Sequence, residues 1–223
     1  MKKKVFDKIF FERAFSEARM RPYYRKYPGN AKKAELHYKQ NIQLAESLVP
    51  SLSVFEVSLR NALIRELERM SGQKDWYRSF QSNVRLKPLY RYVQIASMHI
   101  QTRGESISPD KINGELTLGF WVSLFNAEYE KTLWKGLRLA FPSIPKGWRQ
   151  RKNVSAPLNA IRSLRNRVFH HEAISWNLSR LTELHQLITK VIGWIDPSLQ
   201  EWLKKTDRFE SVVRRIRIRR RFW

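Results

Sequence analysis

Two adjacent histidines follow an Arg-Asn pair in the segment 164–172, which reads Leu-Arg-Asn-Arg-Val-Phe-His-His-Glu. Cleavage of RNA without a metal ion needs a group that moves protons near neutral pH at the ribose 2′-hydroxyl or the leaving 5′-oxygen. It also needs a fixed cation that stabilises the charge developing on the phosphate. Histidine and arginine supply these two functions, so the segment carries residue types suited to metal-independent RNA cleavage.

The hydrophobic periodicity places this segment at the end of a helix that we expect to begin near Ser155 or Pro157 and to run to about His171. At 100° per residue, one face is apolar and consists of Leu158, Ile161, Leu164 and Val168. The other side carries Asn159, Arg162, Ser163, Asn166 and His170.

The same projection orients the candidate residues relative to one another. Asn166 and His170 are one turn apart, so the amide can orient the imidazole or contact the same ligand. His171 falls beside the apolar face, where we expect a structural role. Arg165 projects well over 100° away from His170, which predicts either a distorted last turn or a second copy of the helix, and hence a homodimer.

Other kinds of catalytic or metal site find little support in the sequence. Neighbouring side chains on a helix point in different directions, which argues against metal binding by His170, His171 and Glu172. There is no carboxylate cluster, phosphate-cradling Gly-rich loop or Ser-His-Asp arrangement. His37, His99 and His185 stand alone, and we interpret them as packing or surface residues. We expect neither a metal nor a cofactor.

The net charge predicts a polyanionic partner. The 223 residues include 43 Lys and Arg against 20 Asp and Glu, a formal charge of +23. Nucleic acid, an anionic membrane and an acidic protein all fit, but an aromatic content of 13% favours nucleic acid, because bases stack on aromatic rings. The residues that we expect to contact RNA are Lys146, Arg149, Arg151, Lys152, Arg162, Arg167, Arg214, Arg215, Arg217, Arg219, Arg220 and Arg221.

The sequence lacks cysteines, a recognisable secretion signal and a long apolar run, and these features bear on the cellular compartment. There are no cysteines, so neither a disulfide framework nor a thiolate zinc site can form. Charged residues interrupt what would be the apolar part of a secretion signal after Met1. The longest apolar run, about 116–125, is too short to span a bilayer of about 30 Å. We expect a cytoplasmic protein without a membrane partner.

The elements around the candidate segment indicate an all-α chain. Helical spacing is evident over 35–70, with a kink or two abutting helices at Pro50, and over 87–101 and 178–195. Two short helices are expected within 116–141, a polar loop over 102–114, and a short terminal helix opened by Asp196-Pro197. We divide the chain into a basic aromatic arm (1–36), a helical domain (37–205) and an Arg-rich tail (206–223).

The two ends of the chain allow more than one interpretation. The arm sets Tyr23, Tyr24 and Tyr27 among basic residues and is either an RNA-binding element or a short helix with a solvated loop. The tail has six arginines within its last ten residues. Their repulsion predicts that the tail is mobile until a phosphate backbone neutralises it, or else that it only aids solubility.

At Arg165-Asn166 with His170 and His171, the sequence resembles the HEPN superfamily, whose signature is an Arg, often followed by Asn, and then a His after four to six residues. It is similar in particular to the Abi-like (abortive-infection) branch. That branch has an earlier helix like 54–62 (Val-Phe-Glu-Val-Ser-Leu-Arg-Asn-Ala) and a middle segment like 118–125 (Leu-Gly-Phe-Trp-Val-Ser-Leu-Phe). The resemblance covers roughly residues 38–195.

The resemblance implies a HEPN-like helical bundle and a dimer that brings two Arg/His motifs together. It also implies RNA cleavage that leaves 2′,3′-cyclic phosphate ends, in an antiphage or toxin–antitoxin system. Carried over by position, Arg165 and His170 are catalytic and Asn166 supports them, with His171 at the alternative spacing. Glu172 stands where the branch silenced by nucleotide addition has Tyr, so we do not expect that form of control.

Two further hypotheses stay open from the sequence alone. The protein could bind a structured small noncoding RNA without cleaving it, which the charge supports equally well. Binding of double-stranded DNA is less favoured, because no helix–turn–helix spacing is present. The RNA target, whether tRNA, messenger or small noncoding RNA, is not specified by any motif.

Overall fold

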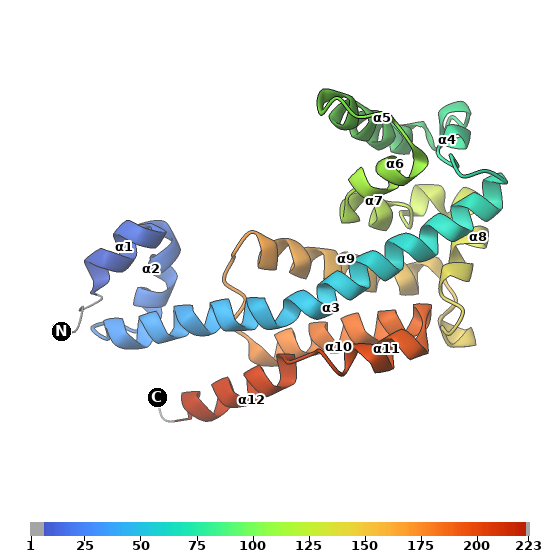
Figure 1. Ribbon diagram of the computed structural model, residues 1–223. Helices are drawn as coiled ribbons and strands as arrows, with labels where there is room; N and C mark the ends of the chain where they lie inside the picture. The colour runs from blue at the N-terminus through green and yellow to red at the C-terminus, as the bar shows by residue number, and fades with distance from the viewer. Residues whose placement is uncertain (1–6, 222–223) are drawn as a thin grey trace. The chain divides into compact units, whose positions relative to one another are not determined.

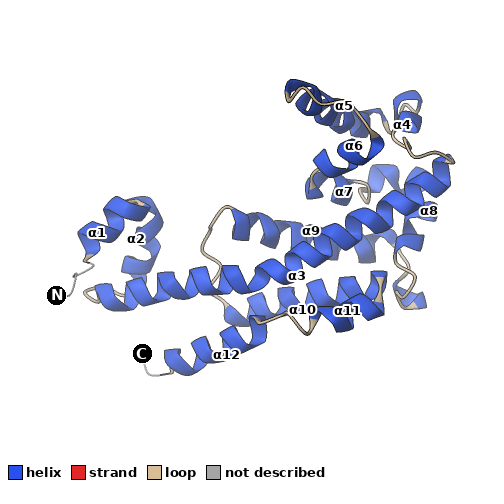
Figure 2. Cartoon of the chain, viewed as in Figure 1, coloured by secondary structure: helices blue, strands red, loops and turns tan. Residues whose placement is uncertain are grey.

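The computed structural model describes residues 7–221. Residues 1–6 and 222–223, the outer ends of the predicted arm and tail, lie outside the described residues. Within the described part the chain forms twelve α-helices joined by turns and has no strand (Figures 1 and 2). The predicted all-α fold class is therefore confirmed.

The helices are bounded as follows: α1 (Lys8–Phe15), α2 (Glu17–Lys26), α3 (Ala31–Ser71), α4 (Arg78–Ser82), α5 (Lys87–Thr102), α6 (Pro109–Glu115), α7 (Leu118–Ser123), α8 (Lys135–Leu137), α9 (Arg151–Phe169), α10 (Leu178–Ile195), α11 (Pro197–Leu203) and α12 (Phe209–Arg220). Short 3-10 turns lie at Ala127–Tyr129, Arg138–Ala140 and Lys146–Trp148, and a π-helical turn lies at Glu130–Trp134.

Several helix boundaries differ from the sequence prediction. Helix α3 continues through Pro50, so the alternative of two abutting helices was wrong, whereas that of a kink at Pro50 stays a prediction. The predicted loop over 102–114 contains α6, which is capped by the Ser108 hydroxyl and has Pro109 in its first turn. Helix α9 begins at Arg151, earlier than the predicted start near Ser155 or Pro157, and ends at Phe169, two residues before the predicted end at about His171.

The Arg-rich segment near the C-terminus is a helix and not the mobile tail that its charge suggests. Along α12 the apolar side chains of Phe209, Val212, Val213 and Ile216 are buried. This spacing of three and four residues lets one face pack while most arginines stay on the other face. Burial of that face stabilises a helix that charge repulsion alone would open.

The chain divides into two compact units, and the division falls at Pro50 within α3. The first unit consists of Met1–Val49, Arg167–Glu183 and Asp207–Trp223. Its core is formed by Met20, Tyr23, Ala34 and Tyr38, with Phe11, Tyr24, Tyr27 and Ala173 packed around them. Tyr23 of the predicted arm is therefore a core residue of this unit.

The second unit consists of Pro50–Asn166 and Leu184–Thr206. Phe55, Leu59 and Leu63 on α3 are fully buried in it. An aromatic cluster follows α3, with the Trp76 ring centroid 5.3 Å from that of Phe80 and 5.9 Å from that of Trp121. The Trp76 indole donates a hydrogen bond to Asn113 (3.1 Å), so its polar edge is satisfied in the core.

One stretch of α3 is long and apolar enough to meet the criteria for a membrane-spanning helix, criteria that the core helix of a soluble protein also meets. The sequence shows no unbroken apolar run in this part of the chain, because the leucines of α3 recur every three or four residues along one face. Leu44, Leu48, Leu52 and Leu59 on that face are at most 1% exposed.

Candidate functional site

Helix α9 carries most of the predicted motif and packs through its apolar face. Leu158, Ile161, Leu164 and Val168 are all buried, which confirms the apolar face that the periodicity predicted. Ser163 and Asn166 on the other side are exposed, and Arg162 is half-buried. The packed face therefore fixes the helix and leaves the polar residues of the motif accessible to a ligand.

The paired histidines lie in the turn that ends α9. His171 has a φ of 55°, in the left-handed region that glycine usually occupies at this position. Its backbone N–H donates to the Val168 carbonyl (3.1 Å), and the N–H of Glu172 donates to the Arg167 carbonyl (2.8 Å). This pair of bonds is a Schellman motif with histidine in place of glycine. His170 and His171 are consequently both exposed.

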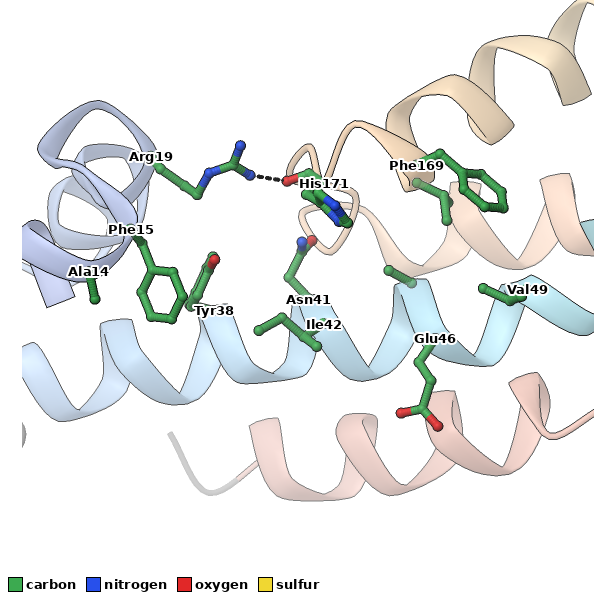
Figure 3. Close-up of a pocket in the computed structure, with 12 residues that line it drawn as sticks. Ala14, Phe15, Arg19, Tyr38, Asn41, Ile42, Glu46, Val49, Phe169 and His171 are labelled. Carbon is green, nitrogen blue, oxygen red and sulfur yellow. Dashed lines mark hydrogen bonds between the residues drawn. The ribbon is translucent and has the colours of Figure 1, made fainter. Parts of the chain in front are cut away.

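Long-range contacts within the first unit hold this turn. Arg19 of α2 donates a hydrogen bond to the His171 carbonyl (Figure 3). The buried Asn41 of α3 donates to the Glu172 carbonyl (3.1 Å) and accepts from the backbone N–H groups of Ile174 (2.7 Å) and Ser175 (3.1 Å). A single amide therefore satisfies three backbone groups of the segment that follows the histidines.

Arg167 adds a local contact to the same turn. Its guanidinium lies 3.3 Å from the Glu172 carboxylate and also donates to the Ala173 carbonyl. The predicted position of His171 beside the apolar face was wrong, because the helix has ended and the imidazole lines an open cleft. The backbone of His171 shapes the turn, and its side chain faces that cleft.

In the second unit, Arg165 forms an ion pair with Glu56 of α3, with 3.2 Å between Nε and a carboxylate oxygen. Both side chains are about 30% exposed. Glu56 belongs to the segment 54–62 and Arg165 to the motif segment, so two of the three segments that carry the family resemblance meet here. The ion pair fixes the direction of the Arg165 side chain.

A buried polar cluster lies next to the histidine turn in the first unit. Arg220 of α12 donates to the Gln40 side chain (2.8 Å) and to the Ser175 carbonyl (3.0 Å). Burial lowers the pKa of Arg220 and raises that of Tyr23 to about 12. These contacts tie α12 to α3 and to the segment after α9.

His37 belongs to the same cluster. Its Nδ1 is hydrogen-bonded to the Tyr27 hydroxyl (3.2 Å), and its ring lies edge-on to that of Trp176, with 4.6 Å between centroids. Burial, together with the positive charges of Arg220 and Lys26, lowers the pKa of His37 to about 4. His37 is therefore neutral at physiological pH.

Some of the predicted RNA-contacting residues make hydrogen bonds or ion pairs within the fold, and most of the set is exposed. Arg151 pairs with Glu130 (2.9 Å) and donates to the Phe125 carbonyl (2.9 Å). Arg149 donates to the Ile144 carbonyl (3.1 Å). The exposed members of the set are Lys146, Arg149, Lys152, Arg167, Arg214, Arg215, Arg217, Arg219 and Arg221.

The remaining histidines are packing or surface residues, as the sequence predicted. His37 and His185 are buried, and His99 on the surface pairs with Glu115 (3.0 Å). Among residues 7–221, no group of three or more His, Cys, Asp or Glu side chains is arranged to hold a metal ion.

Comparison with known proteins adds no assignment: no family model, curated protein or solved structure matches the chain. The function must therefore be inferred from the residues and their geometry.

Sequence reasoning missed Arg19 and Asn41, which hold the histidine turn. Asn41 lies more than 130 residues before its backbone partners, and Arg19 lies 152 residues before His171. No local pattern marks either residue. The only signal that could have found Asn41 is a polar side chain among the apolar positions of a predicted core helix, which requires a buried hydrogen-bonding partner.

Proposed function

We propose that the protein is a HEPN-type endoribonuclease that cleaves RNA as a homodimer and needs no metal ion. The single observation that carries the proposal is the exposed pair His170 and His171 in a turn braced by Arg19 and Asn41. These contacts hold the backbone from which the imidazoles project, and an accessible imidazole is what proton transfer to or from a ribose-phosphate requires. The family resemblance of residues 38–195 points to the same activity.

In the proposed reaction the ribose 2′-oxygen bonds to phosphorus as the bond from phosphorus to the 5′-oxygen breaks. The products are a 2′,3′-cyclic phosphate and a 5′-hydroxyl. The 2′-hydroxyl proton passes to a base, the 5′-oxygen receives a proton from an acid, and His170 acts at one of these two oxygens. Arg165, directed by Glu56, stabilises the charge on the phosphate oxygens. Asn166 and His171 support this site.

The charge of the first unit supports an RNA substrate. Its sequence has 21 Lys and Arg against nine Asp and Glu, a net charge of +12 in 83 residues. The exposed arginines of α12 belong to this unit, and they favour RNA binding whether or not cleavage follows. A non-catalytic protein that binds a structured small noncoding RNA is therefore the second candidate. A role in antiphage abortive infection or in a toxin–antitoxin system rests on the resemblance.

The test is incubation of the purified protein with a mixed pool of tRNA and messenger RNA in EDTA, followed by analysis of the new ends. The proposal predicts fragments with 2′,3′-cyclic phosphate and 5′-hydroxyl ends. Stable binding without new ends, at protein concentrations well above the dissociation constant, would overturn the nuclease and leave the binding protein. Size-exclusion chromatography with light scattering tests the dimer.

A further inference from the structure

The first unit contains a cleft beside the histidine turn, and His171 is one of the residues that line it. Its volume is about 630 Å³, within the range of ligand pockets, about 300–1,000 Å³. Figure 3 shows Phe15 and Tyr38 toward one end, Val49 and Phe169 toward the other, and His171 between them. The walls come from α1, α2, α3 and the end of α9.

The walls of this cleft are mainly carbon and remain open to solvent. Phe15 is 38% exposed, Ile42 is 50% exposed and Phe169 is 45% exposed. The Phe15 ring lies 5.0 Å from that of Tyr38 and is tilted against it. A single chain seldom leaves several large apolar side chains exposed around one hollow unless a ligand covers them.

The charges around the cleft indicate a ligand that carries negative charge. Arg19 lines it, and the only carboxylate among the described lining residues, that of Glu46, is paired with Arg208 (3.2 Å). The unit as a whole has a net charge of +12. An anionic ligand with a flat apolar part satisfies both the charge and the carbon walls.

We propose that this cleft binds an unpaired nucleobase of an RNA strand, next to the phosphate that the histidine turn faces. The inference rests on the RNA-directed part of the proposed function and names its substrate class, single-stranded RNA. The base stacks on Phe169 or Phe15, while the adjoining phosphates face the basic residues of the unit. A base held in a duplex cannot enter, because pairing and stacking keep it inside the helix.

The experiment uses a 12-nucleotide single-stranded RNA with one 2-aminopurine, whose fluorescence falls when the base stacks. The full-length protein should quench this fluorescence and bind the strand more tightly than a duplex of the same sequence. Phe15→Ala and Phe169→Ala should each weaken binding about tenfold and reduce the quenching. Ile42→Glu should also weaken binding and reduce the quenching, because it places a negative charge in the cleft without removing a packed side chain or adding an aromatic ring.

Tyr92→Ala is the matched control, because the exposed fraction of Tyr92 (46%) matches that of Phe169 (45%) and Tyr92 belongs to the second unit, which does not contain the cleft. It should bind and quench as the wild type does. Thermal unfolding of each variant shows whether a loss of binding reflects a loss of structure. If a phenylalanine variant fails to fold, the surface substitution at Ile42 decides the question.

Three results would overturn the proposal. One is equal affinity for the single strand and the duplex, another is wild-type quenching by Ile42→Glu, and the third is a cleft substitution that dissociates an oligomer without changing RNA affinity. The last result would show that a second copy occupies the cleft. Failure of the nuclease proposal is distinct, because it appears as cleavage that His170→Ala does not change, or as no cleavage at all.

Discussion

Arg165 and Glu56 form an ion pair in the second unit, with 3.2 Å between the Arg165 Nε and the Glu56 Oε2 atoms, and this pair joins the C-terminal half of α9 to α3. An ion pair that is about 30% exposed contributes about 1 kcal/mol or less to stability, so its main effect is on side-chain direction. In the proposed reaction this direction aims the guanidinium at the phosphate. Glu56 is therefore a positioning residue.

Replacing Glu56 with Ala should lower the cleavage rate about tenfold, whereas Arg165→Ala should lower it at least a hundredfold, because a group that stabilises the transition-state charge is lost. Glu130→Ala, which removes the partner of Arg151 in the same unit, is the control and should leave the rate unchanged. Single-turnover cleavage of a labelled RNA measures all three. A wild-type rate for Glu56→Ala would remove Glu56 from the mechanism.

Asn41 is expected to be the most sensitive residue around the histidine turn. Asn41→Ala leaves one carbonyl and two N–H groups of Glu172–Ser175 without their partner, which should cost about 2–4 kcal/mol. Asn41→Asp keeps the two accepted bonds and loses the donated one, so it should cost less. Amide hydrogen exchange of Ile174 and Ser175 reports the effect locally. Unchanged exchange in Asn41→Ala would contradict this account.

His171 has a backbone conformation that suits glycine. His171→Gly should therefore raise the free energy of unfolding by about 0.5–1 kcal/mol, because the bond that Arg19 donates to the backbone carbonyl is retained and the left-handed strain is removed. His171→Ala keeps the strain and should not raise it. Urea denaturation of both variants decides between them. A destabilised glycine variant would show that the imidazole packs more strongly than its exposure implies.

Adjacent arginines on α12 should behave in opposite ways. Arg220→Ala removes the donors to Gln40 and the Ser175 carbonyl and should cost about 2–4 kcal/mol of stability. Arg219→Ala is exposed and should change stability by less than about 0.5 kcal/mol. In RNA binding the roles reverse, because only Arg219→Ala should reduce the dependence of log affinity on log salt, by about one. A reduced salt dependence in folded Arg220→Ala would contradict this division.

His37 should make the fold sensitive to acid. Folding lowers its pKa from 6.5 to about 4, so the unfolded chain takes up the proton first as the pH falls. The stability that depends on neutral His37 is fully present above about pH 6.5. It declines between pH 6.5 and 4, with a total loss of about 3 kcal/mol.

Thermal unfolding of the wild type and His37→Gln between pH 4 and 7.5 tests this prediction. The variant should lose less stability over that interval than the wild type does. His170→Gln, which removes an exposed histidine, is the control and should follow the wild type. Parallel curves for the wild type and His37→Gln would assign the acid sensitivity to other groups.

The sequence predicted what depends on local periodicity. The bounds of α10 and the buried face formed by Leu158, Ile161 and Leu164 follow from spacing that packing only reinforces. The end of α9 was predicted two residues too late, because a histidine in the left-handed region carries no sequence signal comparable to glycine. Helix α12 was not predicted, because six arginines in the last ten residues indicate a repulsive tail, whereas burial of a face that includes Val212 and Ile216 stabilises a helix.

The candidate site was predictable only in its residue types. Arg165, Asn166, His170 and His171 are contiguous enough to stand out as a motif. Contacts such as those from Asn41 or Arg220 depend on how distant segments pack, which periodicity cannot specify. The cleft beside the turn has the same origin, because its walls come from parts of the chain far apart in sequence.

The most direct test of the central claim compares cleavage by His170→Ala and His99→Ala, two exposed histidines of which only one belongs to the motif. The rate of appearance of 2′,3′-cyclic phosphate ends is measured in EDTA at saturating protein. We expect His170→Ala to lose at least a hundredfold in rate while it still binds RNA, and His99→Ala to match the wild type. Cleavage by His170→Ala at the wild-type rate would contradict the account.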